Sequence, residues 1–379
     1  MPSKPVIGIS GSGFIGRGLA DHLARGDQYQ LGSVLSRRPA AEVKHPHPQA
    51  LCSDIDSLLR HSDLIVECSG DVLHATEVIE QALAAGKPVV TMNTEFHITV
   101  GSAFVGKGII TEAEGDQPGS LAALHRRALS MGFAPLVLGN IKGFLNHHPE
   151  PAQMQYWAER QGITLAQVTA FTDGSKIQCE QALVANGCQA GIATPGLLGP
   201  VSANLEEAAL SLAAQAEERG RPISDYVLNA GGPAGIFIVG KHPDADALRY
   251  LKLGDGPYYF LLQPFHLCHL EIPTTIAMAL RGEILLDNSK RPETGVIALA
   301  KKELKAGERI DRAMGGFQCR GETAPFSSHH QHPPIGLLQN AIVERTIEAG
   351  AAIRWDQVSL PDSRALTLFR ELLNEHAGN

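Results

Sequence analysis

The chain has 379 residues and a formal net charge of −8, and 44% of its residues are hydrophobic. The acidic balance, with 32 basic residues spread along the chain, argues against nucleic-acid binding. The sequence has no apolar run of the roughly 20 residues that a membrane helix needs, and its first residues do not resemble a leader. We therefore expect a cytoplasmic protein of two or three domains without a membrane partner.

The first 140 residues alternate strand-like apolar runs with helical stretches. Helices are expected near residues 14–25, 72–85 and 121–131. The expected strands are PVIGIS, QLGSVLS, DLIVECSG, KPVVTMN, GIITEA and APLVLGN. Because several of these runs are apolar throughout, they predict a doubly wound parallel sheet with helices on both faces, which is a Rossmann-type α/β domain at residues 1–138.

Beyond Gly139 the pattern changes, because Gly-Pro punctuation becomes dense and strand-like runs such as GIFIVG and YYFLLQPFHL stand between helices. We expect an α+β substrate domain at residues 139–290, ending at the turn-rich SKRPETG. Residues 291–379 then form a small β-rich module. It opens with a strand, a Gly turn and a second strand, and it ends with an amphipathic helix near residues 363–376.

The first strand is followed by a Gly-x-Gly-x-x-Gly turn and a helix, which is the context of a dinucleotide-binding site. The first glycine allows the tight turn, the second lets a pyrophosphate approach the backbone, and the third allows close packing of helix on strand. A merely Gly-rich turn is the alternative. The cofactor-binding residues expected here are Gly11, Ser12, Gly13, Phe14, Ile15 and Gly16.

The second strand ends in Ser36-Arg37-Arg38, where an NAD site usually has an acidic residue. A hydroxyl and two guanidinium groups suit a 2′-phosphate, so we expect NADP(H) to be preferred over NAD(H), unless the arginines are simply solvated. Polar residues that end later strands are assigned to the ribose and nicotinamide end of the cofactor. They are Ser69, Gly70, Asn93 and Thr94.

Together with the glycine turn, five stretches resemble the homoserine-dehydrogenase-like oxidoreductases. The resemblance is closer to the branch with a C-terminal SAF-type module, which includes the DRL (1-deoxy-D-xylulose 5-phosphate reductoisomerase-like) enzymes. It implies NAD(P)-dependent chemistry, although Thr94 stands where homoserine dehydrogenases usually carry a lysine. The five stretches are EAEGDQPG, GNIKGFLN, FTDGSKIQCEQALVANG, PFHLCHLEIP and GVIALAKKELKAGE.

Carbonyl reduction needs a proton donor and a group that polarises the carbonyl. Lys142 follows a strand at the expected mouth of the cleft, and Asp116 lies in a loop at the carboxyl end of another strand. Asp173 is expected to cap a helix on which Lys176 and Glu180 share its stripe by three- and four-residue spacing. The alternative is a solvated helix face. The catalytic candidates are thus Lys142, Lys176, Asp173, Glu180 and Asp116.

Histidines give a weaker signal. His266, His269 and Glu271 alternate as on a strand, and at least one of these histidines is expected to be a core residue. The histidine clusters at residues 147–148 and 329–332 lack the spacing of a metal site, so no metal ligands are assigned. A requirement for a divalent cation stays open, because unrelated reductoisomerases use one.

The sequence therefore predicts an NADP-dependent oxidoreductase that acts on a small polar, polyhydroxylated carbonyl compound, with or without a phosphate. Alternatives are a reductoisomerase that acts on a ketose phosphate, a homoserine-dehydrogenase-like activity, and a non-redox isomerase, lyase or sensor that binds a nucleotide. The C-terminal module is expected to act as a lid or as a contact within a homo-oligomer.

Overall fold

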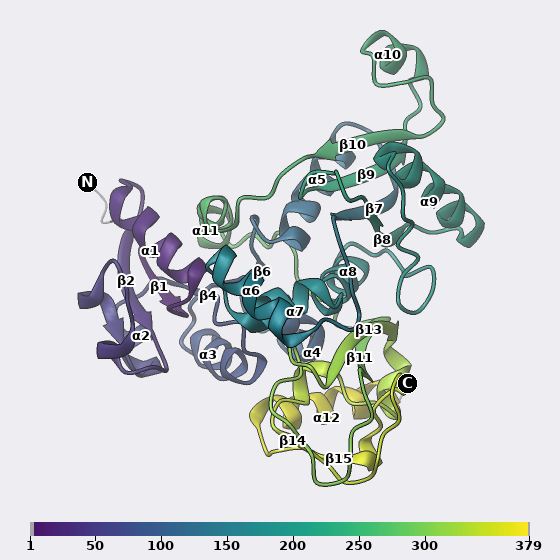
Figure 1. Cartoon of the computed structure of the whole chain (residues 1–379). Helices are drawn as coiled ribbons and strands as arrows, with labels where there is room; N and C mark the ends of the chain where they lie inside the picture. The colour runs from purple at the N-terminus through teal and green to yellow at the C-terminus, as the bar shows by residue number, and fades with distance from the viewer. Residues whose placement is uncertain (1–3, 378–379) are drawn as a thin grey trace.

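The computed structural model describes residues 4–377, so the outermost residues of the predicted segments 1–138 and 291–379 lie outside the described part. Figure 1 shows three parts: the purple and blue N-terminal sheet, the teal and green central sheet, and the yellow-green C-terminal strands. Within the described residues no helix is both long and apolar enough to cross a bilayer.

The N-terminal part is a six-stranded parallel sheet with the strand order β3-β2-β1-β4-β5-β6. The order reverses direction between β1 and β4, and at such a switch point the carboxyl ends of the strands leave a crevice for a ligand. This confirms the predicted doubly wound sheet. Its strands are β1 Val6–Ser10, β2 Gln30–Leu35, β3 Leu51–Cys52, β4 Leu64–Glu67, β5 Val89–Thr91 and β6 Ile110–Glu112.

Helices follow the strands as the alternating pattern predicts. The first and third of them begin at the predicted residues, whereas α5 begins four residues early because Asp116 caps it and Pro118 fits its first turn. The edge strand β3, the short helix that follows it and the short helix after β5 were not predicted. These helices are α1 Phe14–Arg25, α2 Ile55–Arg60, α3 Val72–Ala84, α4 Thr94–Val100 and α5 Gln117–Ser130.

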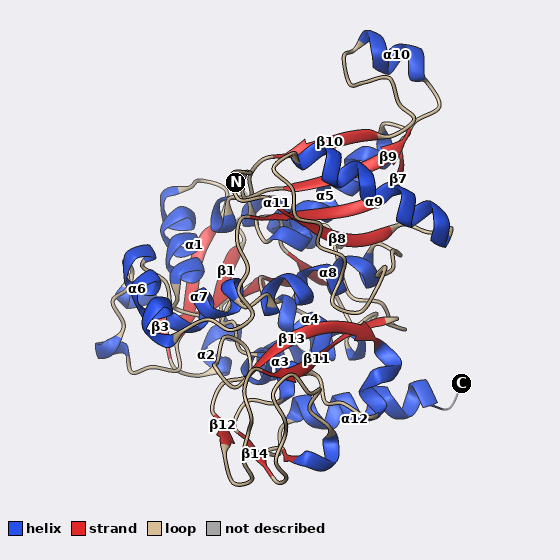
Figure 2. Cartoon of the chain, turned by 45° about the vertical axis from the view of Figure 1, so that its right-hand side comes forward, coloured by secondary structure: helices blue, strands red, loops and turns tan. Residues whose placement is uncertain are grey.

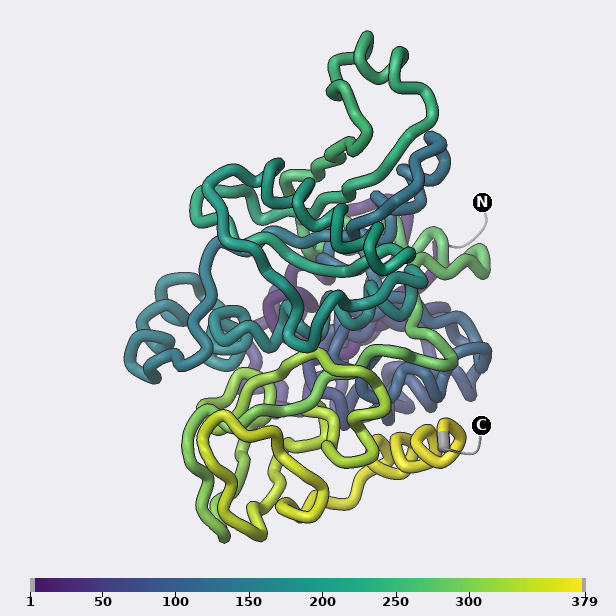
Figure 3. The backbone as a smooth tube through the Cα atoms, turned by 90° about the vertical axis from the view of Figure 1, so that its right-hand side faces the viewer, coloured from purple at the N-terminus to yellow at the C-terminus, as the bar shows by residue number. Residues whose placement is uncertain are grey.

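The cover of the parallel sheet is completed by two helices from much later in the chain. Helix α11 (Ile272–Leu280) packs its apolar side chains against β1, β4 and β5. Helix α12 (Arg364–Ala377), which the tail pattern predicts, lies against α3 and α4. Figure 1 shows α11 beside α1, and Figure 3 shows the yellow α12 running along the blue helices.

The central part is a mixed sheet with the order β10-β9-β7-β8, in which β7 runs parallel to β8 and antiparallel to β9. The stretch APLVLGN belongs here and not to the parallel sheet, so its expected place was wrong. The outer edge of β6 is already occupied, because the Glu112 N–H donates to the Leu286 carbonyl at 2.7 Å. The strands are β7 Ala134–Lys142, β8 Ile223–Leu228, β9 Ile236–Lys241 and β10 Tyr259–Gln263.

The expected boundary at residue 138 falls inside β7; the division into domains stays a prediction. Helix α9 covers one face of the mixed sheet, while α5 and α8 cover the other. Figure 2 shows α8 between this sheet and the strands β11 and β13. The helices of this part are α6 Pro151–Gln161, α7 Leu165–Thr172, α8 Ser175–Gly187, α9 Leu205–Arg219 and α10 Ala245–Tyr250.

The segment after β10 is not the strand that the alternation of His266, His269 and Glu271 predicts. Residues Cys268–Leu270 form a 3₁₀ turn, and Glu271 directly precedes α11. Two backbone features break the extended conformation: Cys268 has a φ of 43°, and Pro273 stands in the first turn of α11.

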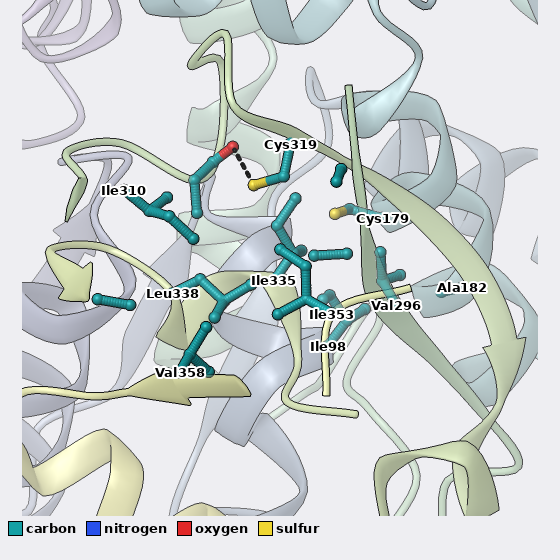
Figure 4. Packing of buried hydrophobic residues seen from close by; sticks show 14 of the residues in the cluster. Ile98, Cys179, Ala182, Val296, Ile310, Cys319, Ile335, Leu338, Ile353 and Val358 are labelled. Atoms are coloured by element: carbon teal, nitrogen blue, oxygen red, sulfur yellow. Dashed lines mark hydrogen bonds between the residues drawn. The ribbon is translucent and has the colours of Figure 1, made fainter. Parts of the chain in front are cut away.

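The C-terminal part contains two small antiparallel sheets, β11 with β13 and β12-β14-β15. The predicted strand–turn–strand near residues 295–310 is confirmed, although its two strands enter different sheets. One apolar cluster joins this part to Ile98 of α4 and to Cys179 and Ala182 of α8 (Figure 4). The strands are β11 Thr294–Ala300, β12 Arg309–Ile310, β13 Cys319–Pro325, β14 Ala341–Val343 and β15 Val358–Ser359.

Candidate functional site

The glycine turn between β1 and α1 has the geometry that a dinucleotide needs. Gly11 has a φ of +118°, which side chains other than hydrogen rarely allow. A Cβ atom at Gly16 would lie 1.9 Å from the Gly11 carbonyl oxygen, whereas a Cβ atom at Gly13 would have no neighbour within 4 Å. The open space at Gly13 is therefore where a pyrophosphate can reach the backbone at the start of α1. Phe14 and Ile15 open this helix; Phe14 is exposed, and Ile15 packs towards the sheet.

Hydroxyl groups and one arginine meet where β1 and β2 end. Ser12 Oγ donates to Ser36 Oγ at 3.0 Å, and the guanidinium of Arg38 donates to Ser12 Oγ at 3.4 Å. The guanidinium of Arg37 turns away and pairs with Asp71 at 2.7 Å. The structure thus brings Arg38 to the two serines and gives Arg37 a partner of its own.

Strand β4, which lies next to β1 in the sheet, ends in a buried acid that the sequence interpretation missed. Glu67 accepts hydrogen bonds from the Ser69 N–H at 2.8 Å and from Asn93 Nδ2 at 3.1 Å. Burial raises the pKa of Glu67 to about 7, against the opposing effect of these hydrogen bonds. Asn93 also caps α4 by accepting from the Phe96 N–H, and Gly70 has a φ of +67°. The predicted residues Ser69, Gly70 and Asn93 therefore share one edge.

Lys176 is the centre of the group that the structure assembles beside this edge. Its ammonium lies 3.4 Å from an oxygen of Asp116, 3.4 Å from an oxygen of Glu95 and 3.5 Å from the Thr94 hydroxyl. Thr94 in turn donates to Asp116 at 3.0 Å. Thr94 was assigned to the cofactor, and its hydroxyl lies in this group as well.

The second lysine has a separate set of partners. Lys142, at the end of β7, lies 3.1 Å from Glu180 Oε2 and donates to Gln117 Oε1 at 2.6 Å. Asn140 Nδ2 donates to the same two oxygens at 3.1 and 2.7 Å. Both lysines therefore lie beside α8, each with a carboxylate partner.

Burial and neighbouring charges set the protonation states of this group. Burial alone would raise the pKa of Asp116, but the charge of Lys176 and hydrogen bonds from Glu112 and Thr94 hold that pKa below its usual range. The surrounding carboxylates, led by Asp116 and Glu95, outweigh burial and raise the pKa of Lys176 well above its usual range. Burial raises the pKa of Glu180, opposed by Lys142 and Lys176. At neutral pH Lys176 is thus an ammonium facing an Asp116 carboxylate.

Asp173 does not cap α8 as predicted, because α7 ends at Thr172 and the chain turns at Gly174, with a φ of +86°. The turn takes Asp173 out of helical register with Lys176. Its carboxylate accepts a hydrogen bond from the Ser175 N–H at 2.8 Å. It also pairs at 2.5 Å with the ammonium of Lys301, the residue that directly follows β11. Asp173 therefore ties the start of α8 to the C-terminal part.

The residues missed by sequence reasoning share one signal. Glu67 and Glu112 end two apolar strands of the parallel sheet, β4 and β6, which lie on either side of β5, and a buried acid is rare there without a role. Glu95, in the first turn of α4, pairs with Lys176. His266 Nδ1 lies 3.0 Å from the Gly115 carbonyl oxygen, to which it can donate a hydrogen bond, next to Asp116.

The histidine clusters do not converge. Within residues 4–377 no group of three or more metal-type ligands is assembled. Of the later cluster, His329 and His332 each place Nδ1 against a backbone carbonyl, 3.0 and 2.9 Å away. His329 is fully buried, and burial lowers its pKa to about 4, so it is a neutral core residue.

Comparison with protein-family models gives two matches that follow the geometry described above. Residues 11–98 match the NAD binding domain of homoserine dehydrogenase, and residues 115–272 match the catalytic domain of oxidoreductase DRL. The first match covers the glycine turn, and the second covers both lysines. The chain is an NAD(P)-dependent oxidoreductase.

The oxidoreductase also resembles solved structures at low sequence identity. One is UDP-N-acetylglucosamine 3-dehydrogenase GnnA from Acidithiobacillus ferrooxidans, with 14% identity over 75% of this chain and 92% of that chain and a TM-score of 0.41. Another is a myo-inositol dehydrogenase from Corynebacterium glutamicum, with 11% identity over 69% of this chain and 75% of that chain and a TM-score of 0.40. S. aureus homoserine dehydrogenase matches at 16% identity over 48% of this chain and 49% of its own length, with a TM-score of 0.31. Similarities at this level carry no inference about substrate. No curated protein matches the oxidoreductase.

Proposed function

We propose that the oxidoreductase transfers a hydride between NADP(H) and a small polar compound, a polyhydroxylated carbonyl or the corresponding alcohol, with or without a phosphate. One observation carries this proposal. The charged Lys176 is held by Asp116 and Glu95 beside α4, and α4 begins at the strand end that also carries Asn93. A fixed cation thus lies next to the edge of the sheet where the nicotinamide end of a dinucleotide belongs.

The residues at the cofactor edge fit NADP(H). The open space at Gly13 suits the pyrophosphate, and bound NADP(H) would supply the hydride. Arg38 with Ser12 and Ser36 offers a guanidinium and two hydroxyls to a 2′-phosphate, which is the basis of the NADP preference. Arg37 contributes less, because it is already paired with Asp71.

Lys176 would polarise the carbonyl and give its proton to the oxygen as negative charge develops there. An ammonium with a raised pKa is a weak acid towards water, but an alkoxide is a much stronger base and takes the proton. Asp116, kept ionised, holds the ammonium in place and stabilises its charge. In the direction of alcohol oxidation the same atoms exchange the proton in reverse.

Lys142, Asn140, Gln117 and Glu180 would bind the rest of the substrate. Their ammonium, amide and carboxylate groups offer both donors and acceptors at one place. Such a set suits neighbouring hydroxyl groups better than an apolar chain, which supports a polyhydroxylated substrate.

The match of residues 115–272 to oxidoreductase DRL favours one second candidate, a reductoisomerase that acts on a ketose phosphate. In that case a carbon-skeleton rearrangement would precede the reduction, and Lys142 would be well placed to hold a phosphate. The resemblance also suggests that the C-terminal part is a SAF-type module, which stays a prediction.

A screen of small aldoses, ketoses and their phosphates, followed by NADPH absorbance with and without Mg²⁺, tests the proposal. Lys176→Met should lower kcat by about 100-fold or more and leave the NADPH dissociation constant nearly unchanged. Lys302→Met, at an exposed lysine paired with Glu308, is the matched control and should behave like the parent protein. Full turnover by Lys176→Met would overturn the assigned role, and a product with a rearranged skeleton would select the second candidate.

A further inference from the structure

Two fully buried ionisable side chains lie close to the group around Lys176. Glu112 ends β6 and His97 lies in α4, and the exposure of both residues is 0%. Glu112 Oε1 lies 3.5 Å from the Thr94 hydroxyl, which itself contacts Lys176 and Asp116. Glu112 Oε2 lies 3.4 Å from His97 Nε2.

The other ring nitrogen of His97 faces a second carboxylate. His97 Nδ1 lies 3.4 Å from Asp287 Oδ1, and the Asp287 side chain is 10% exposed. The backbone of this segment is fixed, because Asn288 Nδ2 donates to the His97 carbonyl at 2.7 Å. A row of ionisable groups thus runs from Lys176 to the protein surface.

The buried polar atoms in this row lack the hydrogen bonds that a purely structural role would require. Both ring nitrogens of His97 and the Oε2 atom of Glu112 lack a hydrogen bond of good geometry, although each has an oppositely placed polar atom at 3.4 Å. Buried polar groups are normally hydrogen-bonded, and an unpaired one lowers the stability of the fold. Small rotations of the ring and carboxyl group would convert these contacts into hydrogen bonds on either side of His97.

Glu112 is suited to hold a proton. Burial, together with the neighbouring charge of Asp116, raises the pKa of Glu112 well above its usual range, while Lys176 opposes this and Glu95 adds to it. This environment favours the carboxylic acid form of Glu112 next to the carboxylate of Asp116. His97 faces ionisable groups on both sides, Glu112 of β6 and Asp287 of the segment after α11.

We propose that Glu112 and His97 form a proton relay that reloads Lys176 from Asp287 at the surface. This inference rests on the proposed function, because it assigns a path to the proton that Lys176 gives to the substrate. In the loaded site the substrate and the nicotinamide would cover the 12% of the Lys176 side chain that is exposed, and this closes the direct path from bulk water.

The steps balance in protons. After the ammonium of Lys176 has given one proton to the alkoxide, the Glu112 carboxyl returns one to the amine through the Thr94 hydroxyl and Asp116. The Glu112 carboxylate then takes the Nε2 proton of His97, while His97 Nδ1 takes a proton from water at Asp287. A half-turn of the imidazole ring, which exchanges its two nitrogens, restores the starting tautomer before the next turnover. Each turnover of reduction thus takes up one proton at Asp287, and alcohol oxidation releases one there.

The relay makes one prediction that needs no substrate. Infrared spectra of the full chain at pH 7 should contain the carbonyl band of a protonated carboxyl group that is lost in Glu112→Gln and retained in Asp287→Asn. If Glu112→Gln leaves the protonated-carboxyl bands unchanged, Glu112 is ionised and the relay is overturned. This measurement is independent of whether any carbonyl compound is turned over, so failure of the relay and failure of the proposed function are distinguishable.

The kinetic test uses the carbonyl compound that the screen finds to be reduced fastest. In rapid mixing with excess NADPH, His97→Gln and Glu112→Gln should show a first turnover at the parent rate, because Lys176 starts protonated. Later turnovers should be slowed by about 100-fold and should carry a solvent isotope effect that the first turnover lacks. Asp287→Asn should slow them less, because water can reach that position.

The matched control is Thr99→Val, a buried polar side chain on the same helix as His97 and outside the relay. It should leave both phases unchanged. First and later turnovers slowed by the same factor in His97→Gln and Glu112→Gln would show a structural role and overturn the relay. Unchanged steady turnover in both variants would overturn it as well.

Discussion

The ammonium of Lys301 lies 2.5 Å from Asp173 Oδ2, and these side chains are 4% and 0% exposed. Lys301 also donates to the Gly316 carbonyl at 2.7 Å, while Asp173 accepts from the first residue of α8. One buried ion pair therefore joins the C-terminal strands to the helix that carries Lys176. The C-terminal part thus helps to fix the position of α8, and with it the position of Lys176.

Removal of one partner should be costly, because it leaves the other charge buried without compensation. We expect Lys301→Met to lower the free energy of unfolding by about 3–5 kcal/mol, and Lys301→Met combined with Asp173→Asn to restore part of the loss. Denaturant titration measures both. Lys302→Met, at an exposed pair, should cost at most about 1 kcal/mol; an equally small loss in Lys301→Met would contradict the buried-pair interpretation.

Gly13 and Gly16 form a matched pair for the cofactor turn. A methyl group at residue 13 has free space, and the φ of Gly13 is an ordinary −80°, so the melting temperature of Gly13→Ala should stay close to that of the parent. The NADPH dissociation constant of this variant should rise by at least about 10-fold, because the methyl group occupies the pyrophosphate position. Gly16→Ala should instead destabilise the fold, since its Cβ atom would collide with the Gly11 carbonyl. Calorimetry and cofactor titration separate the two effects. Unchanged NADPH binding by Gly13→Ala would place the pyrophosphate elsewhere.

The two adjacent arginines should differ in their effect on cofactor choice. Arg38→Ala is expected to raise the dissociation constant of NADPH by about 10- to 100-fold, at the strength of a charge-assisted hydrogen bond, and to leave that of NADH nearly unchanged. Arg37→Ala should have the smaller effect, because Arg37 is paired with Asp71. Equal effects of Arg38→Ala on both cofactors, read by fluorescence titration, would rule out a 2′-phosphate contact.

Glu67 should make stability depend on pH. Its folded-state pKa of about 7 lies above the usual 4.5, so the folded protein binds a proton more tightly than the unfolded chain. The stabilisation is present below pH 4.5 and is lost as the pH rises through about 7, by roughly 3 kcal/mol in total. The difference in unfolding free energy between the parent and Glu67→Gln should therefore shift against the parent between pH 5 and pH 8. A constant difference over that range would mean that Glu67 titrates normally.

The parallel sheet was predictable because five of its strands and its main helices carry their own local patterns, whereas the two-residue edge strand β3 is too short to carry one. The glycine turn identified the cofactor edge for the same reason. The place of β7 was not predictable, since it depends on the occupation of the β6 edge by Leu286, far along the chain. Local patterns do not report which strand edge is free.

The site was predictable only in part. Lys176, Asp116, Lys142 and Glu180 were selected from strand ends and helix spacing, and the structure places them in two neighbouring groups. Glu112 and His97 were missed, because their proximity depends on the packing of α4 on β6. Asp173 was misjudged because a single glycine turn separates it from the helix. The catalytic roles, the NADP preference, the cytoplasmic location and the homo-oligomer stay predictions.

The late helices α11 and α12 have a consequence for how the protein is made. During translation all six strands of the parallel sheet have been made once β6 has emerged from the ribosome. The apolar side chains that later pack on this part, such as Ile276 of α11 and Phe369 of α12, have not yet been made. The nascent nucleotide-binding part therefore exposes apolar surface until α12 has been translated. An isolated fragment that ends after α5 is expected to aggregate or to require a chaperone, and the enzyme should acquire its cofactor only after α12 has emerged.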